Sequence, residues 1–324
     1  MTDICLPIRL VADIGGTHAR FALLDADGKP ALVQVLKCAD YPDIGAAITT
    51  YLARVGDIKP VAAVIAIANP VTGDHVAMTN HHWSFSTQAL QARLGLESLL
   101  VVNDFAALAM SLPSLAQHEL VQIGGGVAVP DEPVGVIGPG TGLGVAGLVK
   151  AGAFWQPLAG EGGHVTLAAA NDFESDIILA LRHRFGHVSA ERILSGPGLS
   201  ILRETVGALL QEAVEPISSA EITHRAIDGE DALCVETVTV FCAMLGTVAG
   251  NLALTLGARG GIYLSGGILP QLGAFLAQSP FRSRFEEKGR FASYLAGIPC
   301  YVIHADQPAL IGASRYFEYC EGAN

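Results

Sequence analysis

A glycine-rich stretch, Val134 to Lys150, holds the residues with the clearest chemical potential in this sequence. It reads VGVIGPGTGLGVAGLVK, with an apolar run, four glycines at alternate positions from Gly138 to Gly144, and a second apolar run. Glycine accepts positive φ and close approach, so backbone N–H groups in such a turn can converge on an anion. A dinucleotide fingerprint or a Walker loop would open a helix, whereas this second apolar run predicts a returning strand. We therefore predict a β-hairpin whose turn either binds phosphate or is purely structural.

The N-terminal region contains a similar pattern. An apolar run, Leu10–Ala12, precedes DIGGT at 13–17, and another apolar run, Phe21–Leu24, follows. The Gly-Thr pair at 16–17 recurs at 140–141, and two such hairpins predict a duplicated unit that holds one polyphosphate from two sides. Only the first copy has an acid, Asp13, whose carboxylate would hold a metal ion against the phosphates, directly or through water. The alternative is an aspartate that only caps the turn.

A polar pair, Asn103-Asp104, ends the short apolar run Leu99–Val102. The run predicts a buried parallel strand, and Phe105 to Leu112 predict a helix. Ligands of open α/β sheets bind at the carboxyl ends of parallel strands, so both side chains are candidates for ligand contact. The alternative is that the pair only caps the helix, which is a common use of these residue types.

Strand and helix patterns alternate along the chain and indicate an α/β protein. Helical spacing predicts helices at Asp43 to Val55 and, after a capping Ser86, at Thr87–Leu94, with a strand buried on both faces at Val61–Ala68. The segment 237–258 has no charge over 22 residues, long enough to span a bilayer. It holds four threonines and lacks aromatic or basic flanks, which favours a helix buried in the core.

The loosely patterned stretch from Pro113 to Pro133 is a plausible domain boundary. We predict a small α/β lobe formed by residues 1–113 plus 305–324 and a large α/β lobe formed by residues 114–304. The terminal helix, Ala309 to Tyr319, is expected to pack back on the first lobe. A turn at Ser265–Ile268 is a plausible nucleoside-binding loop.

Composition limits the class of protein and its partners. The chain has 324 residues, of which 51% are hydrophobic and 15% charged, and this balance indicates a globular protein with room for two cores. The net charge of -12 argues against nucleic acid or an anionic membrane as partner. Six cysteines form no CxxC pair, and the N-terminus lacks the pattern of a signal peptide. We therefore expect reduced thiols and a cytoplasmic location.

Seven motifs appear in one order along the chain: DIGGT at 13–17, MTNHHW at 78–83, NDFAA at 103–107, GPGTGLG at 138–144, GEGGH at 160–164, SAERILSGPGL at 189–199 and LSGGI at 264–268. Together they resemble bacterial glucokinase of the hexokinase/actin-like ATPase superfamily, over nearly the whole chain. The resemblance implies a two-lobed actin-like ATPase (ribonuclease H-like) α/β fold, with duplicated mixed sheets and a cleft between the lobes. It also implies ATP with Mg²⁺, glucose as the acceptor and a homodimer.

The resemblance also implies roles for individual residues. Asp104 corresponds to the base that takes the proton from the sugar's 6-hydroxyl, a step that phosphoryl transfer requires. The residues that hold the sugar would be Asn103, Asp104, Glu161, His164 and Glu191. The residues that hold ATP and its Mg²⁺ would be Asp13 (also the metal ligand), Gly15, Gly16, Thr17, Gly138, Gly140, Thr141, Gly142, Gly266 and Gly267.

A purely structural role, without ligand contact, is an alternative explanation for several of these residues. Glu191 taken alone is a helix-start acid and His164 a core or metal-binding histidine, while Thr17 and Thr141 are equally well explained as turn hydroxyls. His18 stands where relatives have Asn, which leaves its own contact with phosphate open. His81 and His82 are expected to be polar loop residues.

Other functions remain open at this point. A kinase for another hexose, or one that uses ADP or polyphosphate, would need few changes. A catalytically silent sugar sensor and an actin-like assembly or chaperone ATPase are the alternatives from other classes, although intact Asp13 and Asp104 argue against the sensor. A DNA-binding repressor is disfavoured, because the chain lacks a cysteine-rich zinc motif and only twelve residues precede Asp13.

Overall fold

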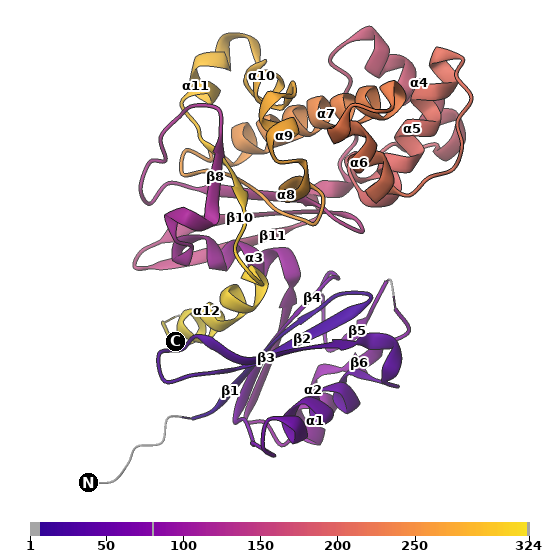
Figure 1. Ribbon diagram of the computed structural model, residues 1–324. Helices are drawn as coiled ribbons and strands as arrows, with labels where there is room; N and C mark the ends of the chain where they lie inside the picture. The colour runs from indigo at the N-terminus through magenta and orange to yellow at the C-terminus, as the bar shows by residue number, and fades with distance from the viewer. Residues whose placement is uncertain (1–6, 80, 323–324) are drawn as a thin grey trace. The chain divides into compact units, whose positions relative to one another are not determined.

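The computed structural model describes residues 7–79 and 81–322. Residues 1–6, including Cys5, and Asn80 of the MTNHHW motif lie outside the described part. The chain divides into two compact units, coloured along the sequence in Figure 1. The first unit comprises the residues up to Leu115, the segment Ala151–Ala159 and the residues from Ala305 on, and the second comprises Ala116–Lys150 and Gly160–His304.

The first unit is built on a five-stranded mixed sheet with strand order β3-β2-β1-β4-β7. The strands are β1 (Arg9–Ile14), β2 (His18–Leu24), β3 (Pro30–Lys37), β4 (Ala62–Ile67) and β7 (Ser98–Asn103). The strands β1 and β2 form an antiparallel hairpin, whereas β1, β4 and β7 run parallel. All six residues of β4 are buried, as the continuous apolar run at Val61–Ala68 predicted, because helices cover both faces of a parallel sheet.

Four helices cover this sheet: α1 (Ile44–Arg54), α2 (Thr87–Leu94), α3 (Asp104–Ser111) and α12 (Pro308–Gly322). Figure 1 shows α1 and α2 together on one side of the strands, with α12 beside α3 on the other. Asp43 and Ser86 cap α1 and α2, each side chain accepting a hydrogen bond from a backbone N–H three residues on. At Gly312 of α12 an added Cβ would collide with the carbonyl oxygen of Ala107 in α3, so the two helices approach very closely. The terminal helix packs back on the first unit, as predicted.

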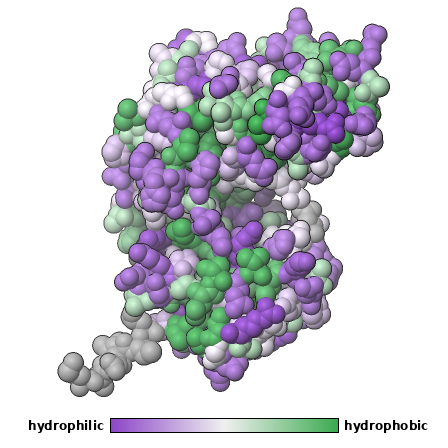
Figure 2. Space-filling view, in the orientation of Figure 1, coloured by the Kyte–Doolittle hydropathy of each residue, from purple (hydrophilic) through white to green (hydrophobic). Residues whose placement is uncertain are grey.

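The edge strand β3 leaves apolar side chains in solvent. Leu32 is 57% exposed, Val33 40% and Val35 49%. Figure 2 shows hydrophobic side chains gathered on this face of the first unit. Leu32 also has a positive φ of 53°, which is uncommon for a bulky residue.

The second sheet repeats this topology. It has the order β11-β10-β9-β12-β13-β8, with β8 (Leu120–Ile123), β9 (Val134–Pro139), β10 (Leu143–Ala151), β11 (Phe154–Gly160), β12 (Gly261–Leu264) and β13 (Cys300–Ile303). All of these strands belong to the second unit except β11, which falls almost wholly in the segment Ala151–Ala159 grouped with the first. The strands β9 and β10 form an antiparallel hairpin, and β9, β12 and β13 run parallel, as β1, β4 and β7 do. The predicted duplication of a mixed sheet is therefore confirmed. The sixth strand, β8, pairs antiparallel with β13 and has no counterpart in the first sheet.

The main helices of this unit are α4 (Asp172–Phe185), α5 (Gly196–Leu210), α6 (Ser219–Asp228) and α7 (Ala232–Leu256). Among the described residues α7 is the one helix long and apolar enough to cross a membrane, but 78% of its most apolar window is buried inside the protein. Its Gly246 and Gly250 lie against backbone carbonyls of Phe281 and Phe285, where an added Cβ would collide or crowd. The helix ends at Gly257, in the left-handed conformation. The core helix predicted for segment 237–258 is confirmed, with its start moved to Ala232.

Short elements complete the fold. A small hairpin joins β5 (His75–Ala77) to β6 (Ser84–Ser86), with His81 and His82 in the loop between them, and four short helices follow β12: α8 (Leu269–Leu272), α9 (Ala274–Gln278), α10 (Phe281–Glu286) and α11 (Ala292–Ala296). The 3₁₀ turns among the described residues are η1 (Cys38–Asp40), η2 (Leu112–Ser114), η3 (Gln117–Glu119), η4 (Gly162–His164), η5 (Ala190–Arg192) and η6 (Gly289–Phe291). The sequence did not predict the strands β5, β6, β8 and β11 or the helices α6 and α8–α11.

Candidate active site

The first glycine turn joins β1 to β2 within the first unit. Gly15 N donates to His18 O at 3.0 Å, which closes the tight turn around Gly16 and Thr17. Asp13 lies opposite Arg20 in the register of the hairpin, and Arg20 Nη1 donates to Asp13 Oδ2 at 3.1 Å. Burial raises the pKa of Asp13, while the charge and the hydrogen bond of Arg20 lower it. Asp13 therefore pairs across the hairpin in addition to leading into the turn, and Arg20 is a site residue that the motifs did not predict.

Asp13 is the acidic residue beside this turn whose carboxylate could bind Mg²⁺. The described residues contain no group of three or more His, Cys, Asp or Glu side chains placed to hold a metal. A site with one carboxylate still fits Mg²⁺, because this ion usually keeps several waters and takes its remaining oxygens from substrate phosphates. The residues present are therefore compatible with a metal shared between Asp13 and a phosphate.

The predicted strand–helix junction at Asn103 and Asp104 is confirmed. Asn103 is the N-cap of α3, and its Oδ1 accepts from the backbone N–H groups of Phe105 and Ala106 at 2.9 and 3.0 Å. Asp104 is the first helical residue, and its Oδ1 accepts from Phe105 N at 2.9 Å. The capping role of Asn103 is therefore real. It does not exclude ligand contact, because Asp104 is half-buried at the carboxyl end of a parallel strand.

Asn69, which none of the predicted site motifs includes, supports this junction. Asn69 follows β4, the strand beside β7, and its backbone O lies 3.5 Å from Asn103 Nδ2. Its side chain donates to Ala77 O and Thr79 Oγ1 at 2.8 and 2.9 Å and accepts from Thr79 N at 3.0 Å. Asn69 thus ties the MTNHHW loop to the Asn103-Asp104 junction. Its position directly after a buried strand was the signal that could have identified it.

The second glycine turn, in the second unit, is the predicted hairpin. Leu143 pairs with Pro139 and Gly144 with Gly138, so residues 140–142 form its tip, and Gly140 N donates to Gly142 O at 2.8 Å. The third glycine turn lies beside the end of β9 that leads into this tip. There Gly266 has φ +93°, and an added Cβ would collide with the carbonyl oxygen of Pro139. Gly140, Thr141, Gly142, Gly266 and Gly267 therefore lie in two neighbouring turns, and Gly138 lies in β9 just before the first of them.

The hairpin tip is docked on the segment Ser189–Gly198. Gly196 N donates to Gly140 O at 2.8 Å, and Leu143 N donates to Glu191 Oε2 at 2.9 Å. At Gly142 an added Cβ would collide with Oε2 of the same Glu191. The Glu191 carboxylate is therefore held directly by the tip of the glycine hairpin.

Glu191 also lies near the GEGGH turn. His164 Nδ1 is 3.9 Å from Glu191 Oε1, and His164 Nε2 is 3.9 Å from Glu161 Oε2. The side chains of His164 and Glu161 are 59% and 54% exposed, so both have room for a ligand. Of the two glycines between them, Gly163 packs on β10, where an added Cβ would collide with Leu143 O. The structure thus brings together Glu161, His164 and Glu191, a set of donors and acceptors that suits a polyol.

Comparison with known proteins identifies the family. The sequence profile of the glucokinase family matches residues 10–319. The chain belongs to the glucokinase family. A curated glucokinase of Aromatoleum aromaticum is 54% identical over 308 residues, which cover 94% of this chain and 93% of that protein. As a member of the glucokinase family, the protein is an enzyme that phosphorylates glucose.

Solved structures of glucokinases share the fold. A glucokinase from an Antarctic psychrotroph has a TM-score of 0.87 and 37% identity, and the match covers 97% of this chain and 99% of that one. A ROK family glucokinase from Streptomyces griseus, solved in complex with glucose and AMPPNP, has a TM-score of 0.65 and 18% identity over 95% of this chain and 98% of that one. The predicted actin-like ATPase fold of the glucokinase family is therefore confirmed.

Proposed function

We propose that this chain transfers the γ-phosphoryl group of ATP to the 6-hydroxyl of glucose, with Asp104 accepting the hydroxyl proton. The observation that supports Asp104 is its place as the first residue of α3, directly after the parallel strand β7. The backbone N–H of Phe105 holds one carboxylate oxygen in place. A fixed carboxylate at the carboxyl end of a parallel strand is suited to orient an acceptor hydroxyl and take its proton.

The sugar hydroxyls would bind to Asn103 and Asp104 from the first unit and to Glu161, His164 and Glu191 from the second. Hydroxyls donate and accept, and this set offers carboxylate acceptors with an imidazole and an amide. The ion-pair distances around His164 support a preassembled set within the second unit.

The ATP phosphates would bind to backbone N–H groups of the turns at Gly15–Thr17 and Gly138–Gly142, and the nucleoside near Gly266 and Gly267. Asp13 would hold Mg²⁺, directly or through water, and the ion would neutralise charge on the phosphates. The AMPPNP and glucose of the Streptomyces griseus relative support this pair of substrates. Both turns have the same strand topology, as copies of one phosphate-binding unit would have.

We further propose a cytoplasmic homodimer. The location is supported by Cys38, Cys234, Cys242 and Cys300, which are buried and form no disulfide among the described residues. The dimer rests on the family alone, and sedimentation of the purified protein tests it.

A coupled assay with a panel of sugars and phosphoryl donors tests the proposed reaction. We expect turnover with glucose and ATP, dependence on Mg²⁺, and glucose 6-phosphate as product. Faster turnover with another hexose, or with ADP or polyphosphate, would replace the proposed substrates. Sugar binding without turnover from any donor would indicate a sugar sensor.

The Asp13–Arg20 pair predicts a pH effect. Arg20 lowers the pKa of Asp13 against the effect of burial, so in Arg20→Met this pKa should rise. The carboxylate form that holds Mg²⁺ is then lost at a higher pH as the solution is acidified. We expect the acid limb of the kcat/KM profile for ATP to move to higher pH, and the activity deficit to shrink as pH rises. Arg54→Met, on the exposed side of α1, is the control. If the acid limb of the profile does not shift in Arg20→Met, the assignment of Asp13 to the nucleotide site is wrong.

A further inference from the structure

A pocket of about 340 Å³ lies entirely within the first unit. It is open to solvent on one side and is lined by the start of β3 with the turn before it, the 3₁₀ turn η2, and the first half of α12 with the two residues before it. None of its lining residues belongs to the sets proposed above for glucose or ATP. Its volume is at the lower end of the range of small-molecule sites, about 300–1,000 Å³.

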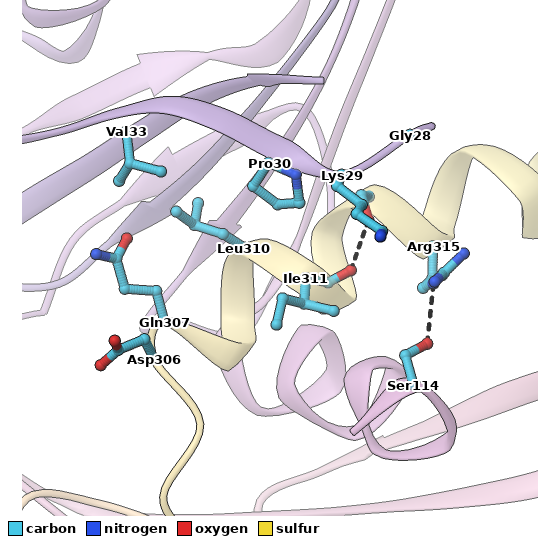
Figure 3. A pocket seen from close by; sticks show the side chains of 11 residues that line it. Gly28, Lys29, Pro30, Val33, Ser114, Asp306, Gln307, Leu310, Ile311 and Arg315 are labelled. Carbon is cyan, nitrogen blue, oxygen red and sulfur yellow. Dashed lines mark hydrogen bonds between the residues drawn. The ribbon is translucent and has the colours of Figure 1, made fainter. Parts of the chain in front are cut away.

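The lining residues are sorted by chemistry along the pocket. Figure 3 shows Lys29 and Arg315 at one end, and Asp306 and Gln307 at the other, with the side chains of Leu310 and Ile311 between them. The helix supplies part of this order, because Ile311 and Arg315 are spaced four apart on one face of α12 and Gln307 directly precedes its first residue. The pocket thus has a cationic end, an apolar middle and an end rich in acceptor oxygens.

Two features of Gln307 raise the free energy of the folded protein. Its Oε1 is buried and has no hydrogen-bond partner among the described residues. Its backbone has φ +51°, a conformation that a residue with a side chain seldom adopts. Costs of this kind gather at sites of function. Because the side chain lines the pocket, a small rotation of its amide would let Oε1 accept from a bound hydroxyl.

The cationic end is held in place. Arg315 Nε donates to Ser114 Oγ at 3.0 Å and its Nη1 donates to Glu318 at 2.8 Å. A guanidinium carries five N–H donors in a fixed plane, so these two contacts orient it and leave donors for an anion. Lys29 is exposed at the other wall, and its backbone N donates to Asp25 Oδ1 at 2.9 Å in the turn before β3.

We propose that this pocket binds a small phosphorylated polyol, such as a sugar monophosphate. The phosphate would lie against Lys29 and Arg315, the hydroxyls would donate to Gln307 and Asp306, and the C–H face would lie over Leu310 and Ile311. A phosphate monoester matches the two cations, and hydroxyls match an end whose side chains offer acceptor oxygens. Inorganic phosphate would contact only the cationic end of the pocket, and an unphosphorylated sugar only the end rich in acceptor oxygens.

Equilibrium dialysis tests this site with the full chain. Glucose 6-phosphate and glycerol 3-phosphate serve as probes, and saturating glucose and AMPPNP keep the proposed active site filled. We expect each probe to bind with one equivalent per chain. Lys29→Met and Gln307→Met should each weaken binding by about tenfold or more, as expected for the loss of a contact to a charged or buried group. The matched controls Lys59→Met and Gln278→Met, at exposed positions outside the pocket, should bind as the parent does.

The outcomes separate this proposal from the proposed reaction. No binding of either probe with the active site filled would overturn it, whatever the catalytic activity. Inorganic phosphate binding as tightly as glucose 6-phosphate would overturn the polyol part. Equal loss in the controls, or no loss in either pocket variant, would place the binding elsewhere. Lys29 is exposed, so Lys29→Met keeps the test valid even if Gln307→Met proves unstable in a thermal melt.

Discussion

In the Asp104→Asn variant we expect kcat to fall by about 10²- to 10⁴-fold, the usual contribution of a general base. The carboxamide keeps the shape of the side chain but cannot take the proton of the 6-hydroxyl. Glucose should still bind, because Asn103 and the second-unit residues remain. Asp104→Ala should abolish turnover in the same way. Steady-state kinetics together with glucose binding by fluorescence or calorimetry measure both quantities.

The chain offers a matched control for this substitution. Asn171 caps α4 as Asn103 caps α3, and Asp172 is the first residue of α4 as Asp104 is of α3. Asp172→Asn therefore removes the same charge from the same helical position, where an acid contributes about 0.3–1 kcal/mol to stability. The two variants should lose similar stability, and only Asp104→Asn should lose turnover. Wild-type turnover in Asp104→Asn would end the assignment of the base.

The second large effect is expected at Gly142. A methyl group there would collide with Glu191 Oε2, the same oxygen that accepts from Leu143 N. Gly142→Ala should therefore displace the Glu191 carboxylate and weaken glucose binding, although the substitution lies in a turn assigned to ATP. Losing a hydrogen bond to a charged group costs about 1.5–3 kcal/mol, so we expect the KM for glucose to rise by about tenfold or more.

Gly140→Ala is the control, since an added Cβ at Gly140 meets nothing within 4 Å. It makes the same change in the same hairpin tip without touching Glu191. Its KM for glucose should stay near that of the parent, whatever happens to the KM for ATP. Equal KM values for glucose in the two variants would show that the contact between Gly142 and Glu191 does not affect glucose binding.

Structural features that depend only on residues adjacent in the sequence were predictable. Ser86 marks the start of α2, Gly257 the end of α7, and the glycines at 140–142 the tip of the β9–β10 hairpin, because caps and turns need particular side chains or φ angles. Elements of only a few residues, such as β8 and α8, were missed because so short a segment shows no period.

Contacts between distant residues were not predictable in this way. Leu143 N and Glu191 are 48 residues apart, and Asn69 and Asn103 are 34 apart; only the folded sheet and its connections bring them together. The Asp13–Arg20 pair is an intermediate case. Once the hairpin and its short turn are predicted, its register places these two residues opposite each other.

The position of α12 has a consequence for synthesis on the ribosome. This helix covers α3, β1 and β4 of the first unit, and its Leu310 and Ala313 are fully buried there, yet it follows every other described element in the sequence. A nascent chain that has emerged only as far as Leu115 lacks this cover. The first unit therefore reaches its final packing only once α12 has emerged, after the whole of Gly160–His304, the main body of the second unit.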